Sequence, residues 1–218
     1  MMRSRSPIGV LLVVAAMSLG VRIADAHQLD EYLQAARIAA ARDRLVVELS
    51  LTPGVAVAPR ILQLIDRDGD GRISAEEIDR YAQRVLGDLE LSVDGTVVPL
   101  ALTRVDCPSS DGMREGTGTI RIEARTAAGL DAGAHRLHFV NAHETASSVY
   151  LVNALVPSDR SLTIGAQRRD VLQRRVDIDV VVAQTYATAF WMLAFAGALG
   201  ALTLVRLTDY SVFSGAHR

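Results

Sequence analysis

The sequence predicts a mostly β, antiparallel sandwich-like domain with an inserted EF-hand helix-loop-helix and one C-terminal transmembrane helix. Three features support this prediction: short alternating apolar runs divided by turn residues, an acidic twelve-residue loop at 66–77, and an uncharged apolar segment near the C-terminus. The chain has 218 residues, 50% of them hydrophobic, and a formal net charge of −2. Because this balance offers no positive field to phosphates, we expect no nucleic-acid partner.

Residues 1–26 have the pattern of an export signal. Arg3 and Arg5 precede an apolar run from Ile8 to Leu19, and Ala24-Asp25-Ala26 places small residues at a cleavage site. Cleavage there would make His27 the first residue of the mature chain. An uncleaved signal anchor is the alternative interpretation.

The clearest motif is the loop at 66–77, Asp-Arg-Asp-Gly-Asp-Gly-Arg-Ile-Ser-Ala-Glu-Glu, which matches every fixed position of the EF-hand pattern. Calcium takes six to eight oxygen ligands, and this spacing supplies them from loop positions 1, 3, 5, 7, 9 and 12. The expected ligands in that order are Asp66, Asp68, Asp70, the backbone carbonyl of Arg72, Ser74 and Glu77. Gly71 at position 6 allows the sharp turn. The sequence therefore predicts Ca²⁺ as the cofactor.

The flanks of this loop predict an EF-hand over about 59–87. Pro59 can begin a short incoming helix, and the outgoing segment repeats apolar residues at helical spacing from Ile78 to Leu86. Ser74 and Glu77 have the spacing of a capping box, and Gly87 follows as a stop signal. The chain has one such loop, so we expect weak binding in the range of extracellular modules, about 10⁻⁴ to 10⁻³ M.

The remaining exported domain, within residues 27–180, is predicted to be strands and turns. Strand-like runs are expected at 44–51, 89–102, 119–124, 136–140, 149–155, 161–164 and 175–180. Asp94-Gly95 is the signal of a two-residue hairpin inside the second run. Residues 106–118 read as a mobile polar loop that carries Cys107, the single cysteine, as a free thiol. One cysteine also excludes an internal disulfide and a cysteine-based zinc site.

Residues 185–206 are predicted to form a transmembrane helix. No charged residue lies between Val180 and Val205, and Arg206 ends the run. We therefore expect a single-pass cell-membrane protein whose main domain is extracytoplasmic and whose tail, 207–218, is cytoplasmic. A buried globular helix is the alternative interpretation.

Histidines form the weaker candidate metal sites. His135, His138 and His143 fall within ten positions, and an N-terminal His27 would offer its amine and imidazole to copper or nickel. On a straight strand His135 and His138 face opposite sides, and His135 shares its side with Leu137 and Phe139. Ordinary surface and strand histidines are the competing interpretation. No serine or cysteine nucleophile pattern, phosphate loop or nucleotide fingerprint is present in the sequence, so we expect no enzymatic activity.

The layout of residues 27–102 resembles the extracytoplasmic part of a bacterial family that precedes nickel/cobalt-type and HupE/UreJ-like membrane transport domains. The resemblance rests on His27-Gln28-Leu29, the strand beginning at Arg44, the calcium loop, Tyr81 and the Leu91–Leu100 segment. The chain has one expected spanning helix where those transporters have several, so transport by this chain alone is not implied. The sequence favours a calcium-binding, membrane-anchored extracytoplasmic protein. The alternative is an accessory subunit of a transition-metal transport system with a multi-span transporter as partner.

Overall fold

The computed structural model describes residues 30–127 and 129–184. The chain divides into two compact units, Met1–Val182 and Ala183–Arg218, and the described residues lie almost entirely in the first unit. The predicted export signal at 1–26, the predicted membrane helix at 185–206 and the tail at 207–218 lie outside the described residues. Among the residues that are described, no helix has the length and apolar character that crossing a membrane requires.

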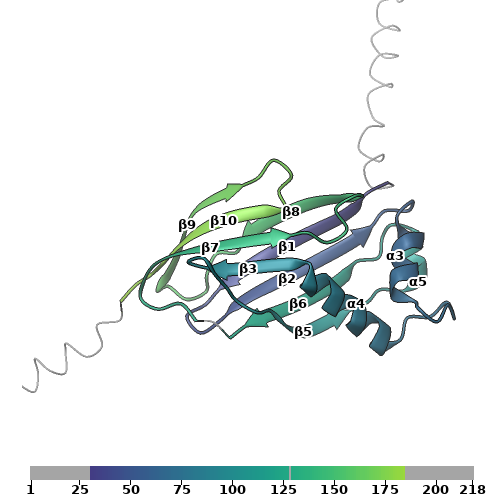
Figure 1. Ribbon diagram of the computed structural model, residues 1–218, viewed down its shortest axis with the longest axis horizontal. Coiled ribbons are helices and arrows are strands. Elements are labelled where there is room, and N and C mark those ends of the chain that lie inside the picture. Colours follow the sequence, from purple (N-terminus) through teal and green to yellow (C-terminus); the bar gives the residue numbers. More distant parts are fainter. Residues whose placement is uncertain (1–29, 128, 185–218) are drawn as a thin grey trace, which may run out of the picture. The chain divides into compact units, whose positions relative to one another are not determined.

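Two five-stranded sheets form the fold. Figure 1 shows their arrangement. The first sheet has the order β5-β6-β2-β1-β8 and the second has the order β4-β3-β7-β10-β9. The strands of the first sheet are β5 (Ala101–Asp106), β6 (Ile120–Thr126), β2 (Leu45–Pro53), β1 (Tyr32–Ala40) and β8 (Ser148–Ala154). The strands of the second sheet are β4 (Thr96–Val97), β3 (Leu89–Val93), β7 (Gly133–Asn141), β10 (Arg175–Val182) and β9 (Leu162–Arg169).

Both sheets bury one face against a common core. In β2 every second side chain is buried, which is the period of a strand with one covered face. Leu49 and Ile122 of the first sheet belong to the same buried cluster as Leu137, Phe139 and Ile178 of the second. The mostly β prediction is therefore confirmed. Among the described strands every pair is antiparallel except β1 with β8, so the sheets are antiparallel as predicted apart from one parallel pair at the edge of the first sheet.

The hairpin predicted at Asp94-Gly95 is present between β3 and β4. Asp94 has φ 51° and Gly95 has φ 83°, the left-handed conformations that this two-residue turn requires. The run from 89 to 102 is not one hairpin, however. After β4 the chain leaves the second sheet, and β5 pairs with β6 in the first.

Residues 106–118 contain a short helix, α5 (Ser110–Arg114), in place of the expected irregular loop. The Ser109 hydroxyl accepts a hydrogen bond from the Gly112 N–H and caps this helix, and the Met113 side chain is fully buried. Cys107 is a free thiol, as expected, but it is partly buried and packs against the core. Burial raises the pKa of the Cys107 thiol to about 11.

A candidate calcium loop and its anchor

The predicted EF-hand is a helix-loop-helix inserted between β2 and β3. Its helices are α3 (Ala58–Ile65) and α4 (Ala75–Gly87), and Figure 1 places both at one end of the domain. Ile61 and Ile65 of α3 and Tyr81 and Val85 of α4 are buried in the common core. The apolar faces of the two helices therefore attach the loop to the sandwich, and its polar residues remain outside.

Three of the predicted ligands converge. The carboxylates of Asp66, Asp68 and Asp70 offer oxygens that all lie within 4.8 Å of one another. The turn that gathers them depends on Gly69 and Gly71, which have φ 74° and 80°. Both glycine N–H groups donate to Asp66, at 2.8 Å to Oδ1 and 3.0 Å to Oδ2. The backbone thus orients the first carboxylate toward the other two.

Arg72 and Ser74 continue the loop into α4. The Arg72 N–H donates to Oδ1 of Asp70 at 2.7 Å, so the Arg72 backbone adjoins the carboxylate cluster. Ser74 is the N-cap of α4 and forms a full capping box with Glu77. Two of the predicted ligand residues therefore also define where the second helix begins.

Glu77 lies outside the three-aspartate cluster and is 7% exposed. Its Oε1 accepts from the Arg67 N–H at 2.8 Å, and its Oε2 accepts from the Ser74 N–H at 3.0 Å and the Ser74 hydroxyl at 2.9 Å. The Ser74 backbone hydrogen bond, followed by that of Arg67, lowers the pKa of Glu77 to about 2. The carboxylate is therefore ionised at neutral pH and would displace no proton on binding a cation.

The donor set fits a hard cation such as calcium. The four carboxylates are all oxygen donors, and Ser74 and the Arg72 carbonyl add neutral oxygens at the spacing that calcium loops use. Glu77 would exchange its contacts with Ser74 for the metal. Among the described residues, Asp66, Asp68 and Asp70 form the only group of three or more acidic, histidine or cysteine side chains close enough to share an ion.

A series of buried hydrogen bonds connects α4 to the β-sandwich. The hydroxyls of Tyr32 and Tyr81 are 2.8 Å apart, and the Tyr81 hydroxyl is 3.1 Å from Nε2 of His143. Nδ1 of His143 is 2.7 Å from Oδ2 of Asp88, the residue that caps the end of α4. Because Nδ1–H donates to this carboxylate, Nε2 is the acceptor for Tyr81, which in turn accepts from Tyr32. Burial lowers the pKa of His143 and favours this neutral form.

Glu144 bridges the two helices that flank the loop at 66–77. Its carboxylate forms ion pairs with Arg60 of α3 and Arg84 of α4, the second at 3.1 Å, and its side chain is only 6% exposed. The residue has φ 49°, an uncommon conformation for a side chain other than glycine. The loop between β7 and β8 therefore contacts this helix-loop-helix through two successive residues, His143 and Glu144.

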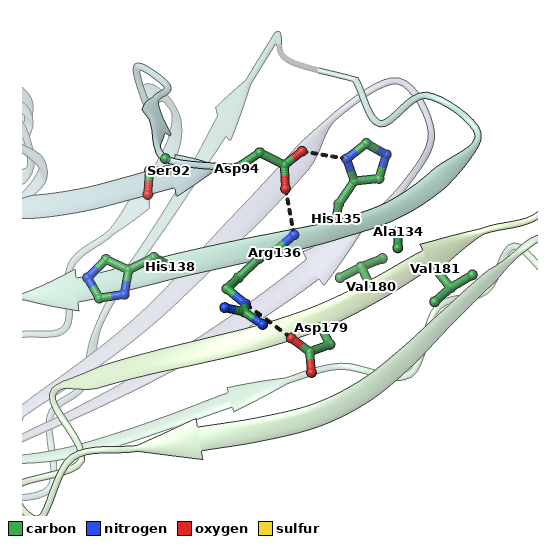
Figure 2. Close-up of a pocket in the computed structure, with 10 residues that line it drawn as sticks. Ser92, Asp94, Ala134, His135, Arg136, His138, Asp179, Val180 and Val181 are labelled. Carbon is green, nitrogen blue, oxygen red and sulfur yellow. Dashed lines mark hydrogen bonds and ion pairs between the residues drawn. The ribbon is translucent and has the colours of Figure 1, made fainter.

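The three clustered histidines do not share a site. Each pairs with a different carboxylate: Nδ1 of His135 with Asp94, Nδ1 of His138 with Asp177, and His143 with Asp88. His135 and His138 line a hollow of about 790 Å³ on the second sheet, which Figure 2 shows, with Asp94 bonded to His135 and to the Arg136 N–H. The His135 side chain is 15% exposed, against 38% for His138, but it pairs with the exposed Asp94 and does not join the buried core with Leu137 and Phe139. His27 lies outside the described residues.

Ile73 occupies position 8 of the loop at 66–77. Ile73 is partly buried and packs against the core. Sequence patterns predicted the loop and α4 but did not point to Glu144, because Arg60 and Arg84 are far from Glu144 in the chain.

Comparison with known proteins finds no family model, no curated protein and no solved structure that matches this chain.

Proposed function

We propose that the protein is a non-enzymatic calcium-binding protein whose loop at 66–77 holds one Ca²⁺ ion. The observation that supports this most strongly is the convergence of Asp66, Asp68 and Asp70 within 4.8 Å, at positions where backbone N–H groups orient their carboxylates. Neighbouring ionised carboxylates repel one another, and a divalent cation removes that repulsion. Glu77, ionised and adjacent in the same loop, supplies the closing ligand.

The same proposal places this domain outside the cytoplasm on a single-pass membrane anchor. The support is in the sequence: the export pattern of residues 1–26 and the uncharged run before Arg206. Calcium outside the cell is often near the affinity expected of a single loop, so the ion acts as a structural or environmental ligand. N-terminal sequencing should find His27 first, and carbonate washing should leave the protein in the membrane. Retention of Met1 or release by carbonate would contradict this placement.

Isothermal titration calorimetry on the full-length chain tests the binding itself. We expect one site with a dissociation constant of about 10⁻⁴ to 10⁻³ M for Ca²⁺. Mg²⁺ should bind much more weakly, because it demands octahedral geometry at shorter distances. Asp68→Asn should weaken binding, whereas Asp79→Asn, an exposed change on α4 outside the loop, should not. Equal binding by the two variants would contradict the assignment.

A further inference from the structure

A groove between α3 and α4 is lined by more basic than acidic side chains. The groove has a volume of about 360 Å³. Residues of both helices and of the calcium loop line it, including Leu64, Arg67, Glu77, Arg80, Tyr81 and Arg84. Three of these side chains are arginines, and Glu77 is the one acidic residue in the lining.

Two of the three guanidinium groups have no acidic partner among the described residues. Within residues 30–127 and 129–184, neither Arg67 nor Arg80 forms a side-chain ion pair, although both are exposed at the groove. Arg84 shares the Glu144 carboxylate with Arg60. The Glu77 oxygens are already occupied by hydrogen bonds from Arg67 N–H and Ser74. The groove therefore presents unneutralised cationic donors and no competing free carboxylate from its own lining.

We propose that this groove binds a small organic anion through Arg67 and Arg80. A guanidinium group donates two parallel hydrogen bonds to the oxygens of a carboxylate, sulfate or phosphate, so two such groups suit a doubly charged ligand. The volume lies at the lower end of the range for small-molecule sites. Leu64 and Tyr81 add an apolar wall, which favours a ligand with a short carbon skeleton over a bare ion.

The anion site is coupled to the calcium site, and this part rests on the proposed function. Arg67 belongs to the calcium loop, and Glu77 both lines the groove and serves as a proposed calcium ligand. A bound Ca²⁺ ion brings two positive charges to the side of the groove where Glu77 lies, so calcium raises the affinity for an anion. Because linkage is reciprocal, the anion raises calcium affinity by the same factor.

Calorimetric titration of the full-length chain with succinate and with sulfate tests the site. The buffer is freed of calcium on a chelating resin, because soluble chelators are themselves anions. We expect saturable binding of both probes, with succinate bound more tightly than sulfate because Leu64 and Tyr81 contact its carbon chain. Arg80→Gln should weaken binding at least about tenfold, the loss expected for a charge-assisted contact. Arg175→Gln, an equal loss of charge at an exposed site on β10, should change it less than about twofold.

Different outcomes test the anion site and its coupling to calcium binding. No saturable binding of either probe, or equal weakening by Arg80→Gln and Arg175→Gln, would overturn the anion site. Repeating the titration at saturating Ca²⁺ should tighten anion binding several-fold, and an unchanged dissociation constant would overturn the coupling. Failure of calcium binding itself would appear in the direct Ca²⁺ titration, which needs no anion.

Discussion

Tyr81→Phe should destabilise the domain strongly although it removes a single oxygen. Tyr32, Tyr81 and His143 are 0%, 2% and 0% exposed, so no solvent replaces the lost hydroxyl. The change leaves two buried groups without partners, the Tyr32 hydroxyl and Nε2 of His143. Each orphaned group costs about 1–3 kcal/mol, so the two together should cost about 2–6 kcal/mol. For a domain of this size that lowers the melting temperature by roughly 5–20 °C.

Tyr150→Phe is the matched control for this prediction. The Tyr150 hydroxyl is also buried and donates to the His143 carbonyl at 2.8 Å, but that carbonyl keeps a second donor, Nε2 of Gln34, at 2.9 Å. Removal of the Tyr150 hydroxyl should lower the unfolding free energy by about 0.5–1.5 kcal/mol, the net value of one ordinary hydrogen bond. Thermal denaturation followed by circular dichroism compares the two variants. A Tyr81→Phe effect no larger than that of Tyr150→Phe would refute the role given to the Tyr32–Tyr81–His143 chain.

Three further predictions concern ionisable groups. Glu144→Gln should lower the unfolding free energy by about 1–2 kcal/mol in denaturant titration, since the half-exposed Arg60 and Arg84 lose one shared partner. NMR titration should place the pKa of His143 below the ordinary value of about 6.5, because of burial, and that of His135 above it, because of Asp94. The contribution of His143 to the unfolding free energy is then fully present above pH 6.5 and is lost as the pH falls below that value. The contribution of His135 is fully present below pH 6.5 and is lost as the pH rises above that value. Cys107 should react with a thiol reagent at pH 8 on the order of 100-fold more slowly in the folded protein than in denaturant, because its raised pKa leaves little thiolate.

Local patterns predicted the loop correctly because its residues act on their near neighbours. Ser74 and Glu77 are three residues apart and form the capping box directly. Asp94-Gly95 likewise forces its own turn. The convergence of the aspartates follows from glycine positions within the loop. Such features need no information from the rest of the chain.

Features that depend on contacts between residues far apart in the sequence were not predicted. β1 is rich in alanine and buries Gln34, so its sequence lacks the bulky alternation typical of strands, and its parallel neighbour β8 lies far along the chain. Met113 is one apolar residue in a polar stretch, and only its burial in the fold shows why α5 forms. The Glu144 ion pairs and the position of His143 depend on tertiary contacts in the same way.

The most direct test of the proposed calcium site is the melting temperature of the full-length chain with and without Ca²⁺, in the native protein, Glu77→Gln and Glu76→Gln. If the dissociation constant is about 10⁻⁴ M, 1 mM free Ca²⁺ stabilises the native protein by about 1.4 kcal/mol, a rise of roughly 3–5 °C. Glu77→Gln keeps the size of the capping side chain but removes its charge, so the rise should largely vanish. Glu76→Gln alters the adjacent exposed residue and should retain it. Identical melting curves for the native protein in calcium and in chelator, or an equal rise in both variants, would contradict the calcium site.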